Sequence, residues 1–343
     1  MQFHKLLIDS PFIFEAGGVL PRIEVAYHTS PHAYRPGEKV IWICHALTAN
    51  SDAEDWWPQM VGPGRLIDTD RYFVVCVNML GSPYGSSSPA SLNPKTGRPY
   101  CLDFPKVTVR DIIHATIEVR KALGIKQIDL LVGSSIGGFQ ALEFAIQEPE
   151  VIRQAAFMAT AARVSPFLTA YEESQRMALE ADPSFLACDS LKGGEAGLRC
   201  ARSIALISYR SYAGYDATQQ DADPDTLFAE RACSYQRYQG KKLSDRFDAY
   251  CYWTLSFSVD SANVGRGRGG VEAALSRIRA ASTVVAIDSD CIFPPHSMKP
   301  IAAAIPGARF HVIHSKFGHD GFLLETAQLT AILQPLLEAC LSS

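Results

Sequence analysis

The residues best suited to chemistry in this chain form the pattern Gly-x-Ser-x-Gly. The pattern lies in Leu130–Gln140, where an apolar run typical of a buried strand precedes a segment typical of a helix. A serine on such a sharp strand-to-helix turn exposes its Oγ as a nucleophile. Two serines are adjacent, but only Ser135 has glycines, Gly133 and Gly137, two positions away on both sides. Those positions around Ser134 hold β-branched residues, so we expect Ser135 to be the nucleophile.

A serine hydroxyl becomes nucleophilic when an imidazole removes its proton, so the chain must also supply a base and an acid. In α/β-hydrolase arrangements the order is serine, then aspartate or glutamate, then histidine. Asp290 lies further than Asp288 into the loop after a predicted strand, which favours Asp290 as the acid. His319, with glycines nearby on both sides, is favoured as the base. The other histidines in this region are His296, His311 and His314.

An acyl intermediate on this serine would need two N–H donors for its oxygen. The predicted strand at residues 40–44 ends in a His-Ala-Leu-Thr loop, and loops at the carboxyl ends of parallel strands line the ligand crevice. We expect the amide of Leu47 to be one donor and the amide of Ile136, the residue after the nucleophile, to be the other. His45 is interpreted as a residue that shapes the loop.

The elements that must position these residues are predicted from apolar runs and helical spacing. They indicate an α/β protein with a mostly parallel central sheet flanked by helices. Strands are expected at residues 40–44, 72–77, 128–132, 154–160, 283–287 and 309–313, and helices at 108–123, 137–147 and 322–341. A hairpin within residues 12–28 is expected to cover one edge of the sheet.

The segment at residues 163–271 has a different pattern, with helical spacing at 167–181 and 197–209 and no strong strand. It is far too long for a connection between neighbouring strands. We therefore predict a helical lid at 163–271, inserted into an α/β-hydrolase core formed by residues 1–162 and 272–343. The glycine- and arginine-rich run at 265–270 is interpreted as the return loop of this lid rather than a phosphate-binding loop.

Composition excludes several classes of partner. The net charge of −4 argues against nucleic acid or a membrane surface as the partner. No apolar run approaches the length of a membrane span, and the first residues lack the pattern of a signal peptide. The nine cysteines show no C-x-x-C spacing, which favours free thiols, no metal site and a cytoplasmic location. No permanently bound cofactor is expected.

Ordered motifs along nearly the whole chain resemble those of the homoserine O-acetyltransferases, a family of the α/β-hydrolase superfamily. Beside the serine turn, the motifs are Cys44–Thr48, Trp56-Trp57 with Gly62–Gly64, Asp68–Val74, Pro89–Pro94, Asp103–Pro105, Arg110-Asp111, Ala201-Arg202, Tyr209, Ser289-Asp290 and Gly318–Asp320. Such an ordered set is far more specific than the serine turn alone.

The resemblance implies a ping-pong transfer in methionine biosynthesis. Ser135 would take an acyl group from acyl-CoA, most simply acetyl-CoA, and pass it to the hydroxyl of L-homoserine. It also implies that Arg202 and Asp320 hold the amino-acid substrate, with Tyr209 on the same helix as Arg202, and that the protein is a homodimer. A zwitterion needs a cation for its carboxylate and an anion for its ammonium group, which agrees with these two charges.

Several positions differ from the family pattern, and they leave alternatives open. The family usually has glycine at Ser134 and methionine at Ile136, and it tends to have His-Asp-Val where this chain has Ala262–Val264. Succinyl-CoA as the donor, and serine or another hydroxy amino acid as the acceptor, remain alternatives. A serine esterase or hydrolase of the same fold, and a non-catalytic binding protein that keeps the fold, are further alternatives.

Overall fold

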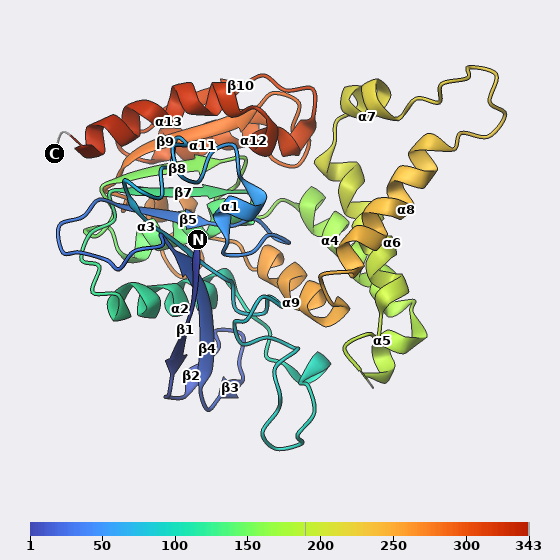
Figure 1. The fold of residues 1–343 in the computed structure, drawn as a ribbon, viewed down its shortest axis with the longest axis horizontal. Helices are drawn as coiled ribbons and strands as arrows, with labels where there is room; N and C mark the ends of the chain where they lie inside the picture. Colours follow the sequence, from blue (N-terminus) through green and yellow to red (C-terminus); the bar gives the residue numbers. More distant parts are fainter. Residues whose placement is uncertain (189, 342–343) are drawn as a thin grey trace.

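The computed structural model describes residues 1–188 and 190–341. Asp189 of the predicted lid, and Ser342 and Ser343 of the predicted core, lie outside the described residues. An eight-stranded sheet in the order β1-β4-β6-β5-β7-β8-β9-β10 forms its centre (Figure 1). The strands are β1 (Gln2–Ile8), β4 (Ile23–Thr29), β5 (Val40–Cys44), β6 (Phe73–Val77), β7 (Leu130–Ser134), β8 (Gln154–Met158), β9 (Ala281–Ile287) and β10 (Arg309–Ile313). Within this sheet, as far as the structure describes it, the β1–β4 and β4–β6 pairs are antiparallel and the other pairs are parallel. The predicted α/β fold with a mostly parallel sheet is confirmed.

Helices cover both faces of the sheet because alternate side chains of each buried strand point to opposite sides. In β5, Val40 and Trp42 belong to one apolar cluster, and Ile41 and Ile43 belong to the other. The first cluster is covered by α2 (Val109–Ala122), α3 (Ile136–Gln147), α10 (Val271–Leu275) and α11 (Pro295–Ala304). The second is covered by α1 (Ala53–Trp56), α12 (Gly321–Leu324) and α13 (Thr326–Leu341). The last two form the single helix predicted at 322–341, with a break at Glu325.

The N-terminal segment differs from the prediction of an edge hairpin. A small hairpin does form, from β2 (Phe12–Ile13) and β3 (Val19–Leu20), but it is a separate two-stranded sheet. The next strand, β4, lies inside the main sheet, and β1 pairs with it residue for residue from Gln2 to Ile8. The prediction of the edge was therefore wrong, because the strand that covers the edge is β1.

Between β8 and α10, the residues that the structure describes form six helices, which lie at one side of the sheet (Figure 1). They are α4 (Pro166–Glu180), α5 (Pro183–Ala187), α6 (Glu195–Tyr209), α7 (Tyr212–Gln219), α8 (Arg231–Ser244) and α9 (Ala249–Asp260). The chain leaves and re-enters the core at one point, because the amide of Val164 donates to the carbonyl of Ala262 and that of Val264 donates to the carbonyl of Ala162, both at 2.9 Å. The boundaries 163 and 271 stay a prediction.

The end of α6 and the start of α7 lie against the loop after β10, which includes the short 3-10 helix η2 (Gly318–Asp320). Gly318 has φ +67°, and a Cβ there would lie 2.7 Å from the amide nitrogen of Ser211. The hydroxyl of Ser211 donates to the carbonyl of Lys316. This contact explains why a glycine precedes His319: the backbone of Tyr209, Arg210 and Ser211 occupies the space that a side chain would need. The other 3-10 helix, η1, spans Cys101–Asp103.

Candidate active site

Ser135 lies on the sharp turn between β7 and α3, with φ +59° and ψ −128°. A residue with a side chain rarely adopts this backbone conformation, and such strain is concentrated at functional sites. The turn fits only because its neighbours are glycines. A Cβ on Gly133 would lie 2.1 Å from the carbonyl oxygen of Gly137, and one on Gly137 would lie 2.1 Å from that of Cys44. The turn therefore presses α3 against the ends of β5 and β7 and leaves the hydroxyl of Ser135 at the carboxyl end of β7, in the middle of the sheet.

The structure brings His319 and Asp290 to this hydroxyl from two distant loops. Nε2 of His319 lies 2.9 Å from Oγ of Ser135, and Nδ1 lies 2.7 Å from Oδ2 of Asp290. The other oxygen of Asp290 accepts the amides of Ile292 and Phe293, at 2.8 and 3.0 Å. These bonds fix the carboxylate, and the carboxylate fixes the ring of His319 with Nε2 toward the serine. Asp288 points elsewhere and binds Nδ1 of His314 at 2.9 Å.

The electrostatics of His319 suit a base. Burial by itself lowers the pKa of this ring, but the charge and hydrogen bond of Asp290 outweigh it and raise the pKa above 6.5. The ring is 3% exposed and packs against Tyr209, Phe293 and Phe322, with centroid distances of 5.8, 5.4 and 5.3 Å. His319 can therefore take the proton of the serine hydroxyl and hold it as a stabilised cation.

The two predicted amide donors lie beside the serine. Leu47 and Ile136 both line a small cavity with Ser135, and within the described residues neither amide donates to a backbone acceptor. His45 holds the first loop: its Nδ1 lies 2.9 Å from the carbonyl of Ala46, and its Nε2 accepts the amide of Met79 at 3.3 Å. Burial lowers the pKa of His45 to about 4, although the bond to Ala46 opposes this, so the ring is neutral and structural.

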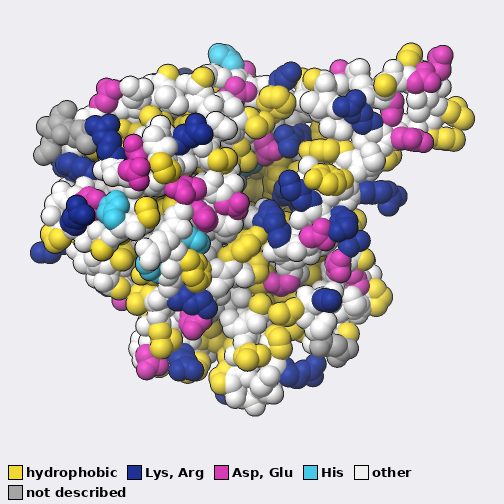
Figure 2. Space-filling model, in the orientation of Figure 1, with side chains coloured by type: hydrophobic (Ala, Val, Ile, Leu, Met, Phe, Trp, Pro, Cys, Tyr) yellow, Lys and Arg dark blue, Asp and Glu magenta, His cyan; other side chains and the backbone are white. Residues whose placement is uncertain are grey.

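A cavity of about 580 Å³ between the core and the helices of the predicted lid contains Ser135, His319 and all three predicted substrate-binding residues. Figure 2 shows this hollow with lysine and arginine side chains gathered around it. The guanidinium of Arg202 lies over the ring of Tyr209, 5.4 Å from its centroid. Among the residues described, no carboxylate lies within ion-pairing distance of Arg202, so its charge is available to an anionic ligand. Burial raises the pKa of Tyr209, which keeps its phenol neutral.

Asp320 has a partner that sequence reasoning missed. Its Oδ2 forms an ion pair with Arg210 at 3.0 Å. Burial raises the pKa of Asp320, while Arg210, His319 and Arg202 oppose this shift. Arg210 follows Tyr209 directly and caps the end of α6 in an extended conformation, so no helical spacing in the sequence indicates this partner. The pair leaves Oδ1 of Asp320 for a ligand and balances the charge of the carboxylate.

Other residues of the cavity also had no functional prediction. Trp56 lines it, and its ring stacks on that of Trp57 with centroids 5.6 Å apart. Lys242 and Arg246 add positive charge from α8 and the segment after it. Glu172 lines the small cavity beside Ser135, and its Oε2 has no hydrogen-bond partner in the described part of the chain. Nothing in their local sequence distinguishes these residues from packing or surface residues.

Comparisons with known proteins agree with this geometry. Residues 39–326 match the model of the α/β-hydrolase fold family. A homoserine O-acetyltransferase of Cyclobacterium marinum is 37% identical over 320 residues, which cover 93% of this chain and 91% of the relative. The chain belongs to the homoserine O-acetyltransferase family. The resemblance stated from the sequence is thereby confirmed.

Solved structures show the same fold over nearly the full length. A homoserine O-acetyltransferase of Staphylococcus aureus is 30% identical, with a TM-score of 0.81 and coverage of 98% of this chain and 95% of that one. An acetylester hydrolase of Corynebacterium glutamicum has a TM-score of 0.86 at 23% identity, covering 98% and 96% of the two chains. The second likeness concerns the fold alone, which the homoserine O-acetyltransferase family shares with esterases.

The described residues show two further features of this family member. No helix among them is long and apolar enough to cross a membrane. Among the same described residues, no group of three or more His, Cys, Asp or Glu side chains is arranged to hold a metal ion.

Proposed function

We propose that the protein transfers an acetyl group from acetyl-CoA to the hydroxyl of L-homoserine, through an acyl-enzyme on Ser135, in methionine biosynthesis. The relatives that define its family are named for this activity. The observation that carries the proposal is the hydrogen-bonded chain from Ser135 through His319 to Asp290, in one cavity with Arg202 and Asp320.

In the first half-reaction, Oγ of Ser135 attacks the thioester carbonyl of acetyl-CoA while Nε2 of His319 takes the hydroxyl proton. The amides of Leu47 and Ile136 stabilise the negative oxygen of the tetrahedral intermediate, and each such donor is commonly worth about 10²- to 10³-fold in rate. The carbon–sulfur bond then breaks, and His319 returns the proton to the leaving thiolate. CoA leaves, and the acetyl group stays on Ser135.

In the second half-reaction, the hydroxyl oxygen of homoserine attacks the acyl carbon while Nε2 of His319 removes the hydroxyl proton. The bond between this carbon and Oγ of Ser135 then breaks, His319 returns the proton to Oγ, and O-acetylhomoserine leaves. Arg202 would bind the substrate carboxylate and Asp320 the ammonium group. The ammonium adds a positive charge beside Asp320, whose carboxylate is already paired with Arg210. The neutral phenol of Tyr209 contacts both Arg202 and His319 and so keeps the carboxylate site next to the base.

Hydrolysis is the second candidate function, because water in place of homoserine would complete the same cycle, and the likeness to an acetylester hydrolase favours considering it. Arg202, which has no ion-pair partner among the described residues, lines the same cavity as Asp320, and these two charges favour an amino acid over water as the acceptor. The ratio of O-acetylhomoserine to free acetate among the products separates the two functions.

Intact-mass spectrometry after mixing with acetyl-CoA tests the proposal. We expect one acetyl group on Ser135, discharged quickly by homoserine and slowly by water. Ser135→Ala should abolish the added mass, and Ser134→Ala, one residue earlier in the same turn, is the matched control that should keep it. Labelling by succinyl-CoA but not by acetyl-CoA would show that the donor is succinyl-CoA. Discharge by serine as fast as by homoserine would show that the acceptor is not specifically homoserine. An acetyl group lost to water as fast as to homoserine would establish a hydrolase.

Arg202→Ala should raise the KM for homoserine at least tenfold, while acetylation of Ser135 stays within about twofold of the unchanged protein. Arg199→Ala, one turn earlier on α6 and paired with Glu195, is the control for loss of an arginine. Equal loss of both half-reactions in the first variant would contradict a role in binding the acceptor.

We also propose, from the resemblance and the cysteine pattern, that the protein works as a homodimer in the cytoplasm. Sedimentation equilibrium of the purified protein tests the dimer: twice the mass of the chain is expected, and a single mass equal to that of one chain would refute it.

A further inference from the structure

A small cavity beside Ser135 offers a place for the alkyl part of an acyl group. We call it the acyl cavity; its volume is about 20 Å³, and its lining includes Leu47, Ile136, Phe139, Ile292 and Phe293. A cavity of this size holds about one water-sized group. Ser135, Leu47 and Ile136 all line this cavity, so with the oxygen of an acyl-serine at the two amides the substituent on the acyl carbon has room here, beside the larger cavity through which the substrates enter. A methyl group matches the space.

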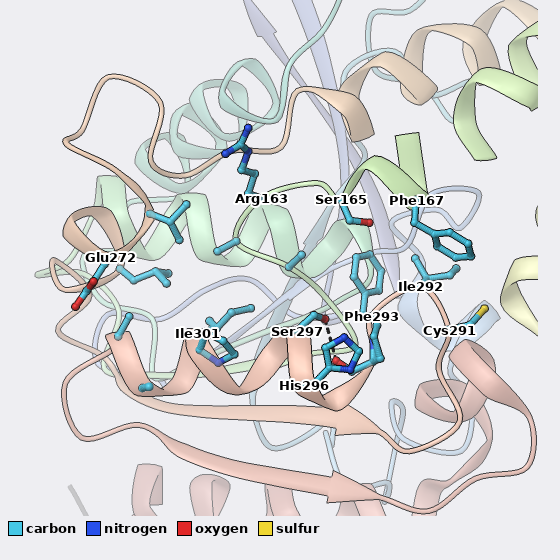
Figure 3. A pocket seen from close by; sticks show the side chains of 18 residues that line it. Arg163, Ser165, Phe167, Glu272, Cys291, Ile292, Phe293, His296, Ser297 and Ile301 are labelled. Atoms are coloured by element: carbon cyan, nitrogen blue, oxygen red, sulfur yellow. Dashed lines mark hydrogen bonds between the residues drawn. The ribbon is translucent and has the colours of Figure 1, made fainter. Parts of the chain in front are cut away.

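A much larger hollow lies on the other side of two of these residues. We call it the outer groove; it has a volume of about 770 Å³ and lies between the chain after β8, helix α10 and helix α11. Ile292 and Phe293 line both the outer groove and the acyl cavity. Figure 3 shows both side chains at the end of the outer groove where Ser165 and Phe167 lie opposite. Most other lining residues are apolar, from Ala161 to Ala304.

The side chains that separate the two spaces are held firmly. Phe293 is 2% exposed, and its ring packs edge-on against Phe139, with centroids 5.7 Å apart and planes at 89°. Its other neighbour is the ring of His319, at 5.4 Å. The amides of Ile292 and Phe293 both donate to Asp290. The dividing wall is therefore attached through its backbone to the acid of the candidate triad, and its side chains can be shortened without removing those two donors.

We propose that the side chains of Ile292 and Phe293 form the wall that limits the acyl group on Ser135 to two carbons. This inference rests on the proposed acyl transfer and names the class of donor, a short uncharged acyl thioester. A longer acyl chain would have to pass through the space that the ring of Phe293 occupies. Beyond that ring lies apolar room for several methylene groups, so the wall, and not the bulk of the protein, sets the limit.

Phenylalanine 293 gives the sharper test because Phe293→Ala removes the ring that faces both spaces. We expect the unchanged protein to lose kcat/KM steeply from acetyl- to butyryl- to hexanoyl-CoA. In the variant, each methylene placed in the opened groove should favour the longer donor by about fourfold. Hexanoyl is longer than acetyl by four methylenes, so the ratio of kcat/KM for hexanoyl- over acetyl-CoA should rise by roughly 250-fold. Ile292→Ala, which shortens the wall at its other member, should shift the ratio in the same direction.

Phe322→Ala is the matched control. Phe322 also packs on the ring of His319, at 5.3 Å, and is 3% exposed, but it lines the larger cavity around Arg202 and not the wall. Its loss should lower the rates for all chain lengths by the same factor. An unchanged hexanoyl-to-acetyl ratio in both wall variants, or an equal shift of this ratio in Phe322→Ala, would overturn the proposal.

The same series with p-nitrophenyl acetate, butyrate and hexanoate separates this inference from the proposed function. These esters acylate Ser135 without CoA or homoserine, so their chain-length preference depends on the acyl cavity alone. A shift toward hexanoate in Phe293→Ala supports the wall even if acetyl-CoA proves not to be the donor. Acylation by acetyl-CoA with no shift on either substrate series leaves the transferase standing and refutes the wall.

Discussion

The buried carboxyl group of Glu172 allows a quantitative prediction of how stability depends on pH, because it is removed from water. It lies on α4 with 2% of its surface exposed, and its Oε2 has no hydrogen-bond partner. Burial raises the pKa of Glu172 from 4.5 to about 8; the charge of Asp260 adds to this effect, and Arg176 and a hydrogen bond from Gln175 oppose it. Arg176 itself is held by Asp260 at 2.7 Å, so it neutralises Glu172 only in part.

The sign of the linked stability follows from proton binding. Between pH 4.5 and about 8 the folded chain keeps the proton of Glu172, while the unfolded chain has lost it. The free energy of unfolding therefore falls as the pH rises through this window and becomes level above it. At about 1.4 kcal/mol per pKa unit, the loss between pH 6 and pH 9 is about 2.5 kcal/mol. Glu172→Gln removes this dependence. The free energy of unfolding of the variant, relative to that of the unchanged protein, should therefore be about 2.5 kcal/mol higher at pH 9 than at pH 6.

Urea unfolding of both proteins at pH 6 and pH 9 measures this double difference, in which the other titrating groups cancel. Glu173→Gln, which removes the more exposed neighbouring carboxylate on the same helix, controls for the loss of a negative charge. A stability difference between Glu172→Gln and the unchanged protein that is the same at both pH values would refute the assignment of a proton to Glu172.

Three further predictions concern the catalytic geometry. Asp290→Asn should lower kcat by about 10³-fold or more and, because Asp290 raises the pKa of His319, shift the acidic limb of the pH–rate profile to lower pH; an unmoved limb would contradict the pairing. Gly137→Ala would place a Cβ 2.1 Å from a carbonyl oxygen of β5 and should destabilise the fold by roughly 3 kcal/mol or more in urea unfolding; an unchanged midpoint would show that the turn can open. Arg210→Ala removes the partner of Asp320 and should raise the KM for homoserine with little change in acetylation of Ser135; pre-steady-state labelling that slows as much as turnover would count against this role.

The structure links the acceptor site to the base through the helices of the predicted lid. Arg202, Tyr209 and Arg210 come from α6 and its end, and the chain after them is fixed to the loop of His319 by Ser211 and Gly318. Residues that bind the amino acid and the residue that moves the proton therefore share one contact surface. A change at the end of α6 is expected to act on both substrate binding and the orientation of the histidine loop.

The sequence by itself determined the parts of this protein that depend on local pattern. Apolar runs indicated the parallel strands, and glycines two positions on either side of Ser135 selected the correct serine of the pair for the strained turn seen in the structure, because only glycine fits against the carbonyl oxygens there. The chain order of serine, aspartate and histidine then indicated Asp290 and His319. In the structure His319 lies within hydrogen-bond distance of both Ser135 and Asp290.

Only the tertiary structure decided which charges are paired and which spaces are open. Arg210, rather than Arg202, holds Asp320, and this depends on where α6 ends against the histidine loop. The isolation of Glu172 and the shared wall of Ile292 and Phe293 depend on helices and loops that are far apart in the sequence. Burial, ion pairing and cavity volume are properties of the assembled molecule, since each is set by neighbours that no local pattern specifies.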